Sequence, residues 1–194
     1  MFHLVAMAAS AGGLSALAAV LEKLPRDFPL PIAVVQHVDP DHESFLAGIL
    51  GRRTKLRVMQ GEDGARLDAG TVYVAPPGTH MEVEAAEDGA HIRLMRSEPV
   101  HFLRPSADRL FVSAAAECSP VLGVVLTGNG SDGAIGTQAI KAAGGTVIAQ
   151  SEASAQFVGM PHAAIATGVV DYVLPLIEIA PALLRLTARS DDDF

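Results

Sequence analysis

Short apolar runs alternate along the chain with longer segments of helical periodicity. The apolar runs predict strands at residues 4–9, 32–36, 71–75, 121–127, 146–150 and 172–174. The helical spacing predicts helices at about 14–24, 43–53, 106–118, 134–143, 161–167 and 179–189. Pro181 would lie in the first turn of the last helix, where its missing N–H does little harm. This alternation is typical of βαβ units, so we predict an α/β fold with a mainly parallel sheet flanked by helices.

One segment has a different pattern. Within residues 80–96, apolar and polar residues alternate on both sides of Asp88-Gly89. Strict alternation around such a turn is typical of two antiparallel strands. We therefore expect a small antiparallel hairpin beside the parallel sheet.

Length and composition indicate one globular domain. The chain has 194 residues, of which 49% are hydrophobic and 19% are charged, so we expect residues 1–190 to form one domain and residues 191–194 an acidic tail. Cys118 is the lone cysteine, which excludes internal disulfides and any site built from several cysteines; we expect it in the core. The formal net charge of −8 argues against nucleic acid as a partner.

The N-terminal segment is apolar enough to be compared with a signal peptide. Glu22 is the first charged side chain, but a signal peptide starts with positive charge. Gly12-Gly13 also divides the segment into a strand and a helix. No other uncharged stretch reaches the roughly 20 residues of a membrane helix. We therefore expect a cytoplasmic protein without membrane insertion.

Three chemically capable residues follow predicted strands. Ser10 follows residues 4–9, His37 follows residues 32–36, and Asp132 lies in the loop after residues 121–127. In open α/β sheets, ligands bind beyond the carboxyl ends of the strands. A serine, a histidine and an aspartate at one sheet edge could act as nucleophile, general base and orienting carboxylate.

Each of these residues also has a structural interpretation. Ser10 is a typical cap for the first helix, and Asp132 for the helix that begins near Gly133. His37 could be a polar residue bonded to a loop. Spacing along the chain does not separate these alternatives from catalysis.

Two other kinds of site are compatible with residues in this sequence. Gly128, Gly130 and Gly133 have the spacing of a dinucleotide fingerprint, with Glu152 after the next strand; however, Asp132 would place a carboxylate where the pyrophosphate must bind. The second alternative is a metal site made of His37, Asp39, Asp41 and His42. These neighbouring residues fit a loop leading into a helix equally well.

With these residues in view, the chain resembles the catalytic domain of the chemotaxis protein-glutamate methylesterases, the CheB family, over about residues 5–181. The segments that carry the resemblance are Ala9-Ser10-Ala11-Gly12-Gly13, Val35-Gln36-His37, Ala75-Pro76-Pro77-Gly78-Thr79-His80-Met81, Arg104-Pro105-Ser106-Ala107-Asp108-Arg109-Leu110-Phe111, Leu126-Thr127-Gly128-Asn129-Gly130-Ser131-Asp132-Gly133-Ala134 and Gly159-Met160-Pro161-His162-Ala163-Ala164. Each is weak alone, but their shared order is highly specific.

The resemblance implies a doubly wound, mainly parallel α/β domain with Ser10 as nucleophile, His37 as general base and Asp132 as orienting carboxylate. The implied reaction is hydrolysis of glutamate γ-methyl esters on the cytoplasmic helices of chemoreceptors, through an acyl-enzyme. Many members also deamidate glutamines on these receptors. Backbone N–H groups at Ala11 and Asn129 would form the oxyanion hole. The family implies no metal and no organic cofactor.

The chain departs from the family pattern at several positions. Ala11 stands where threonine is common, Asn129 where methionine is common, and Val38 where methionine is usual. Ala11 removes a side-chain hydroxyl near the triad, whereas a backbone N–H survives at Asn129 and Val38 is harmless. We therefore expect altered kinetics; a signalling or binding module without turnover is the alternative. Members typically carry an N-terminal receiver domain, which this sequence does not contain. We therefore expect regulation, where there is any, to come from a separate protein.

Overall fold

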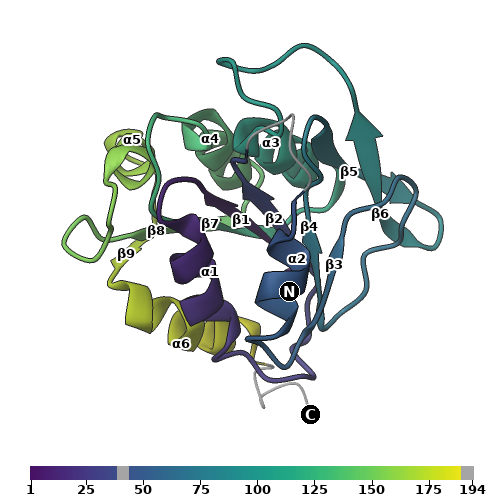
Figure 1. Cartoon of the computed structure of the whole chain (residues 1–194), viewed down its shortest axis with the longest axis horizontal. Coiled ribbons are helices and arrows are strands. Elements are labelled where there is room, and N and C mark those ends of the chain that lie inside the picture. Colours follow the sequence, from purple (N-terminus) through teal and green to yellow (C-terminus); the bar gives the residue numbers. More distant parts are fainter. Residues whose placement is uncertain (39–43, 189–194) are drawn as a thin grey trace.

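The computed structural model describes residues 1–38 and 44–188. Seven strands form a parallel sheet in the order β3-β4-β2-β1-β7-β8-β9 (Figure 1). Their bounds are β1 Leu4–Ala9, β2 Ile32–Gln36, β3 Arg57–Gln60, β4 Thr71–Val74, β7 Val121–Val125, β8 Thr146–Gln150 and β9 Tyr172–Leu174. The chain starts in the centre and winds outward in both directions, so the expected doubly wound α/β fold is confirmed.

Helices cover both faces of the sheet (Figure 1). One layer consists of α1 (Gly13–Leu21), α2 (Leu46–Gly51) and α6 (Leu176–Thr187). The opposite layer consists of α3 (Ala107–Glu117), α4 (Ala134–Ala142) and α5 (Gly159–Ala166). This two-sided cover explains why the central strands read as continuous aliphatic runs.

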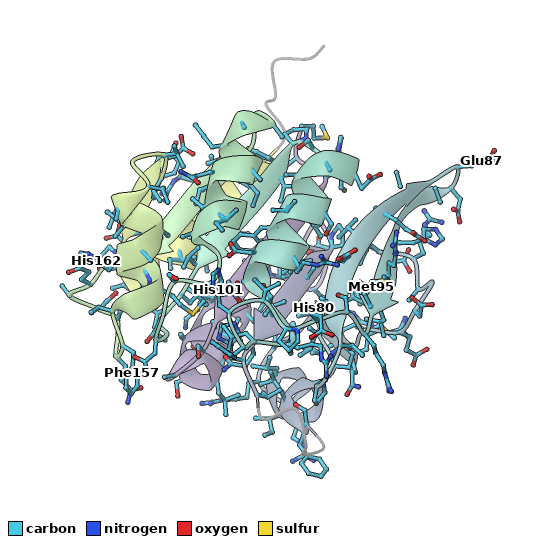
Figure 2. The ribbon with its side chains drawn as sticks, turned by 90° about the horizontal axis from the view of Figure 1, so that it is seen from above. His80, Glu87, Met95, His101, Phe157 and His162 are labelled. Carbon is cyan, nitrogen blue, oxygen red and sulfur yellow. The ribbon has the colours of Figure 1, made fainter. Side chains whose placement is uncertain are left out.

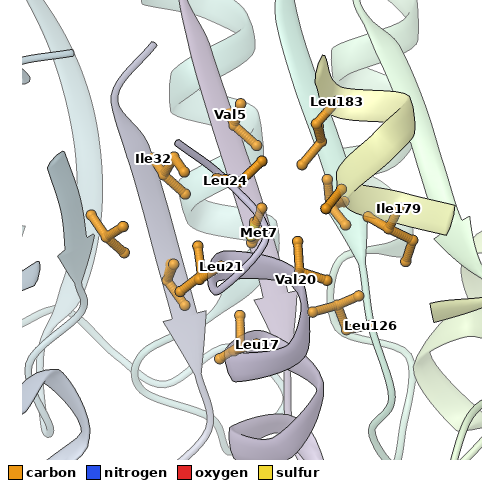
Figure 3. Close-up of a cluster of buried hydrophobic side chains, with 14 of the residues drawn as sticks. Val5, Met7, Leu17, Val20, Leu21, Leu24, Ile32, Leu126, Ile179 and Leu183 are labelled. Atoms are coloured by element: carbon orange, nitrogen blue, oxygen red, sulfur yellow. The ribbon is translucent and has the colours of Figure 1, made fainter. Parts of the chain in front are cut away.

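The central strand β1 divides its side chains between two hydrophobic clusters. Val5 and Met7 face the layer of α1, α2 and α6, a region shown in Figure 3. Leu4 and Ala6 face the layer of α3, α4 and α5. Successive side chains of a strand point to opposite faces, and all of β1 is buried. Burial of apolar surface stabilises a fold by about 25 cal/mol per Å². This fully buried strand therefore contributes strongly to the stability of the centre of the fold.

The hairpin forms as expected, with its turn displaced by one residue. β5 (His80–Ala86) pairs antiparallel with β6 (Gly89–Met95). The turn consists of Glu87 and Asp88, because Gly89 already pairs with Ala86. Figure 2 shows this hairpin projecting from the body, with Glu87 at its tip and His80 at its base.

Two details of the helices and strands were not anticipated. α6 begins at Leu176, so Pro181 lies inside the helix and the prediction that it lies in the first turn is wrong. The edge strand β3 was missed, since its residues are only partly buried and lack a clear apolar pattern.

The helix expected at 43–53 is confined to α2 among the described residues, and the acidic tail lies outside them. Cys118 is buried, as expected.

No helix among residues 1–38 and 44–188 is long and apolar enough to cross a membrane.

Candidate active site

The candidate site lies at the carboxyl ends of the central strands. Ala9 pairs with Gln36 in the register of β1 and β2, so Ser10 and His37 leave the sheet side by side. The loop after β7, on the other side of β1, contains Asp132. β1 and β7 flank the point where the winding reverses direction, which is where open α/β sheets form their binding crevice.

His37 and Asp132 form a direct hydrogen bond. Nε2 of His37 lies 2.7 Å from Oδ2 of Asp132. Only 9% of the histidine side chain and 1% of the aspartate side chain are exposed. This bond places the Nε2 proton on the aspartate side, which leaves Nδ1 as the unprotonated nitrogen of the neutral ring.

The Asp132 carboxylate accepts three further hydrogen bonds. Oδ1 accepts from Ser106 Oγ at 2.8 Å and from the Asp108 N–H at 3.0 Å. Oδ2 accepts from the Ala107 N–H at 2.6 Å in addition to His37. Asp132 therefore caps α3, which lies across the site, and not the helix that follows it in sequence.

This environment favours the ionised form of Asp132. Burial acts to raise the pKa of Asp132. The hydrogen bonds from His37 and from the Asp108 and Ala107 N–H groups outweigh burial and hold the pKa of this carboxyl below its usual range. The positive end of the α3 dipole acts in the same direction. The group beside His37 is thus a fixed negative charge at neutral pH.

Asp108 makes the reciprocal contact with α4. Its Oδ1 accepts the Gly133 N–H at 2.9 Å and the Gly136 N–H at 2.7 Å. Burial and the nearby Asp132 charge raise the pKa of Asp108 against the effect of these two bonds. The helix N-terminus that a pyrophosphate would need is therefore already occupied by a carboxylate, which argues against the dinucleotide interpretation.

Ser10 is held through its backbone. Its N–H donates to the Thr127 carbonyl at 3.0 Å, and its carbonyl accepts the Gly13 N–H at 2.8 Å and Gln36 Nε2 at 2.8 Å. Gly12, in the left-handed conformation, is the residue that precedes α1, and no side chain caps that helix. Ser10 is therefore not a helix cap, and its hydroxyl is left without a hydrogen bond to any residue that the structure describes.

Gly128 is in close contact with the Ser10 side chain. A Cβ at residue 128 would lie 2.3 Å from Met160 Sδ and 2.8 Å from Ser10 Cβ. Real atoms cannot approach so closely. Glycine at this position therefore allows the loop after β7 to pack closely between Met160 of α5 and the Ser10 side chain.

Ala11 and Asn129 lie on the two loops that border Ser10. The Ala11 carbonyl accepts a hydrogen bond from Thr127 Oγ1 at 3.1 Å, which ties the turn after β1 to the end of β7. Asn129 is exposed beside Gly159 at the start of α5. Within the described part of the chain, neither backbone N–H has a hydrogen-bond acceptor.

Several residues that build the site were not assigned a role from the sequence. They are Gln36, Ser106, Asp108 and Thr127. Gln36 Nε2 donates to the carbonyls of both Ser10 and His37, at 2.8 and 3.0 Å. The only signal for these residues was their presence in the segments that resemble the methylesterases, since neither spacing nor polarity distinguishes them from surface residues.

The metal interpretation depended on residues 39–42, of which Asp39, Asp41 and His42 lie outside the described residues. Among residues 1–38 and 44–188, no group of three His, Cys, Asp or Glu side chains could hold a metal ion. The imidazole of His37 is directed at Asp132 instead.

Comparison with known proteins identifies similar sequences and a similar fold. The family model described as CheB methylesterase matches residues 5–183. A protein-glutamate methylesterase/protein-glutamine glutaminase of Anaeromyxobacter dehalogenans is 47% identical over 186 residues, which are 95% of this chain and 53% of that protein. The protein-glutamate methylesterase FrzG of Myxococcus xanthus is 42% identical over 95% of this chain and 54% of its own length.

The fold comparison is equally close. The catalytic domain of the Thermotoga maritima CheB methylesterase superposes with a TM-score of 0.93 at 35% identity, covering 96% of this chain and 99% of that one. The chain spans about half the length of the curated relatives it matches. On sequence and fold together, this chain belongs to the CheB methylesterase family.

Proposed function

We propose that this protein is a protein-glutamate methylesterase that uses Ser10, His37 and Asp132 to hydrolyse glutamate γ-methyl esters on the cytoplasmic helices of chemoreceptors. The observation that carries the proposal is the buried 2.7 Å hydrogen bond between His37 and Asp132, beside the serine that ends β1. The names of the relatives supply the substrate class. Such a substrate places the protein in the cytoplasm.

The orientation of His37 determines the direction of proton transfer. Since Nε2 faces Asp132, Nδ1 takes the hydroxyl proton of Ser10 as Oγ attacks the ester carbonyl. The imidazolium that forms is stabilised by the ionised Asp132, which stays deprotonated throughout. The free N–H groups of Ala11 and Asn129 receive the negative charge that develops on the carbonyl oxygen.

The remaining steps return the enzyme to its starting state. The tetrahedral intermediate collapses as Nδ1 gives its proton to the methoxide, and methanol leaves. A water molecule, deprotonated by the same nitrogen, then attacks the acyl-enzyme and releases the glutamate carboxylate and the Ser10 hydroxyl. A glutamine amide follows the same course with ammonia as the leaving group, consistent with the second name of the relatives.

One observation favours a second candidate, a binding module without turnover: the Ser10 hydroxyl makes no hydrogen bond to His37 or to any other described residue. Only an activated serine reacts readily with a fluorophosphonate. Labelling of Ser10 by such a probe supports the esterase, and an unlabelled Ser10 in folded protein supports the binding module.

The direct test is methanol release from a methylated receptor fragment. Ser10→Ala should lower kcat by about 10³-fold or more, because the nucleophile is removed. Ser119→Ala is the matched control, since this serine lies before the amino end of β7, at the opposite edge of the sheet. Among the described residues, its hydroxyl donates only to the Ala115 carbonyl. A Ser10→Ala variant as active as Ser119→Ala would refute the proposed function.

A further inference from the structure

A chain of buried hydrogen bonds connects the base of the hairpin to Asp132. The Ser106 N–H donates to His80 Nδ1 at 3.2 Å, and Ser106 Oγ donates to Asp132 Oδ1 at 2.8 Å. Both Ser106 and His80 are completely buried, with 0% exposure. We propose that Ser106, held in place by His80, is a positioning residue that orients the Asp132 carboxylate towards His37; this inference rests on the proposed function.

The tautomer of His80 follows from its two partners. Nδ1 accepts a backbone N–H, so it carries no proton. Nε2 lies 3.1 Å from the Glu98 carbonyl oxygen, so Nε2 carries the proton and donates it there. The imidazole is therefore neutral, with a lone pair permanently directed at the Ser106 backbone.

The charged groups around His80 are compatible with a neutral ring. Burial is the largest effect and lowers the pKa of His80. The Glu98 carbonyl raises the pKa, and the positive charges of Arg109 and Arg104 lower it. Glu82 acts in the opposite direction to the arginines. The net shift is downward, so the acceptor at Nδ1 persists at neutral pH.

Ser106 differs from the other partners of Asp132 in what it contributes. The Ala107 and Asp108 donors are backbone N–H groups in the first turn of α3, whereas Ser106 donates a side-chain hydroxyl that a substitution can remove. Without the Ser106 hydroxyl, Oδ1 would keep only the longer, 3.0 Å bond from Asp108. The Ala107 N–H would still bind Oδ2, but the carboxylate could then rotate about its Cβ–Cγ bond and lose its alignment with His37 Nε2. The hydroxyl thus restricts the rotation that matters for the base.

His80 also gives this arrangement a rigid support. It opens β5 and pairs with Met95 of β6, at the base of the hairpin where it meets the body (Figure 2). The position of Ser106 is therefore set by the hairpin as well as by α3. Such indirect supports keep catalytic groups within the narrow geometry that proton transfer needs.

The first test compares two serines of the same region. Ser106→Ala should lower kcat about tenfold with KM unchanged. It should also move the acid limb of the kcat/KM profile to lower pH by about half a unit, because a carboxylate that is less well aligned with His37 Nε2 stabilises the imidazolium less strongly. Ser113→Ala is the control, since the Ser113 hydroxyl accepts the Val83 N–H and serves only the contact between α3 and β5.

The control separates positioning from simple loss of structure. We expect Ser113→Ala to lower the melting temperature without moving the acid limb. An unmoved acid limb and unchanged kcat in Ser106→Ala, with Ser10→Ala inactive, would overturn this inference and leave the proposed function standing. Activity in Ser10→Ala would instead refute the proposed function itself.

The second test separates the two nitrogens of His80. In His80→Asn, the amide oxygen replaces Nδ1 as acceptor for Ser106, whereas in His80→Gln the amide reaches the Glu98 carbonyl and leaves the Ser106 N–H without a partner. The asparagine variant should retain the wild-type pH profile, and the glutamine variant should shift it as Ser106→Ala does. The reverse order would overturn the role given to His80.

Discussion

Two neighbouring aspartates should respond in opposite ways to the same substitution. Asp132 uses both carboxylate oxygens as acceptors, with two donors on each. Asp108 accepts both of its helix N–H bonds on Oδ1 alone. Replacing either residue by asparagine keeps one acceptor oxygen and turns the other into an amide donor, so the two sites lose different numbers of bonds.

The magnitudes follow from these contacts. In Asp132→Asn, the amide faces two buried donors, each of which costs about 1–3 kcal/mol when left unsatisfied, so the free energy of unfolding should fall by about 2–6 kcal/mol. In Asp108→Asn, Oδ1 keeps both the Gly133 and Gly136 N–H bonds, and the repulsion between the two carboxylates disappears. We expect this variant to lie within about 1 kcal/mol of the wild type at neutral pH, or above it.

The dependence of stability on pH gives the same pair a second signature. The pKa of Asp132 is lowered on folding, so its contribution to stability is present above its ordinary pKa of about 3.9 and is lost as pH falls through the folded value. The pKa of Asp108 is raised, so its contribution is full below about 3.9 and is lost as pH rises through the folded value. Asp132→Asn should lack the loss of stability at low pH, and Asp108→Asn should lack the loss of stability as pH rises.

Urea unfolding of wild type and both variants, followed by circular dichroism between pH 3 and 7, measures all of these quantities. Methanol release should be nearly abolished in Asp132→Asn, since the amide cannot hold the imidazolium, and retained in Asp108→Asn. Equal destabilisation of the two variants would refute the assignment of acceptors made above. So would a destabilising effect confined to Asp108→Asn.

The remaining predictions concern the support of Ser10. Gly128→Ala should reduce the free energy of unfolding by about 1–3 kcal/mol and lower kcat, because its Cβ would overlap Met160 and displace Ser10; Gly48→Ala, with open space around it in α2, should be neutral or stabilise by about 0.5–1 kcal/mol in the same urea titration. Gln36→Glu should impair methanol release, because a carboxylate would face the two carbonyl oxygens that Nε2 now binds. Full activity in either Gly128→Ala or Gln36→Glu would contradict the role given to these residues in holding Ser10 in place.

Much of the fold could be predicted from local patterns. The bounds of β1, β2 and β8 agree with the apolar runs, because a strand covered on both faces has few polar positions to interrupt it. The bounds of β9 also agree, although it is an exposed strand at the sheet edge. The edge strand β3 escaped prediction for the opposite reason, since its half-exposed residues carry no such pattern. The helix that contains Pro181 begins earlier than expected, at Leu176, whose side chain also packs against the core.

The candidate site, like the fold, could be predicted from the sequence only in part. Ser10 and His37 could be predicted to be neighbours, since both directly follow adjacent parallel strands. Which helix Asp132 caps could not be predicted, because capping signals are read along the chain and Asp132 binds α3 across space. The orientation of His37 depends on that same contact.

The sequence alone determined the alternation of strands and helices, the sheet edge where the chemistry lies, and the family to which the chain belongs. Those features depend on residue type and on spacing between near neighbours. Only the tertiary structure decided that Asp132 and Asp108 exchange helix caps, that His37 directs Nε2 at Asp132, and that His80 accepts the Ser106 N–H. The physical reason is that these hydrogen bonds join residues about 25 to 95 positions apart, and short-range bonds of fixed direction exist only after packing has brought their donors and acceptors together.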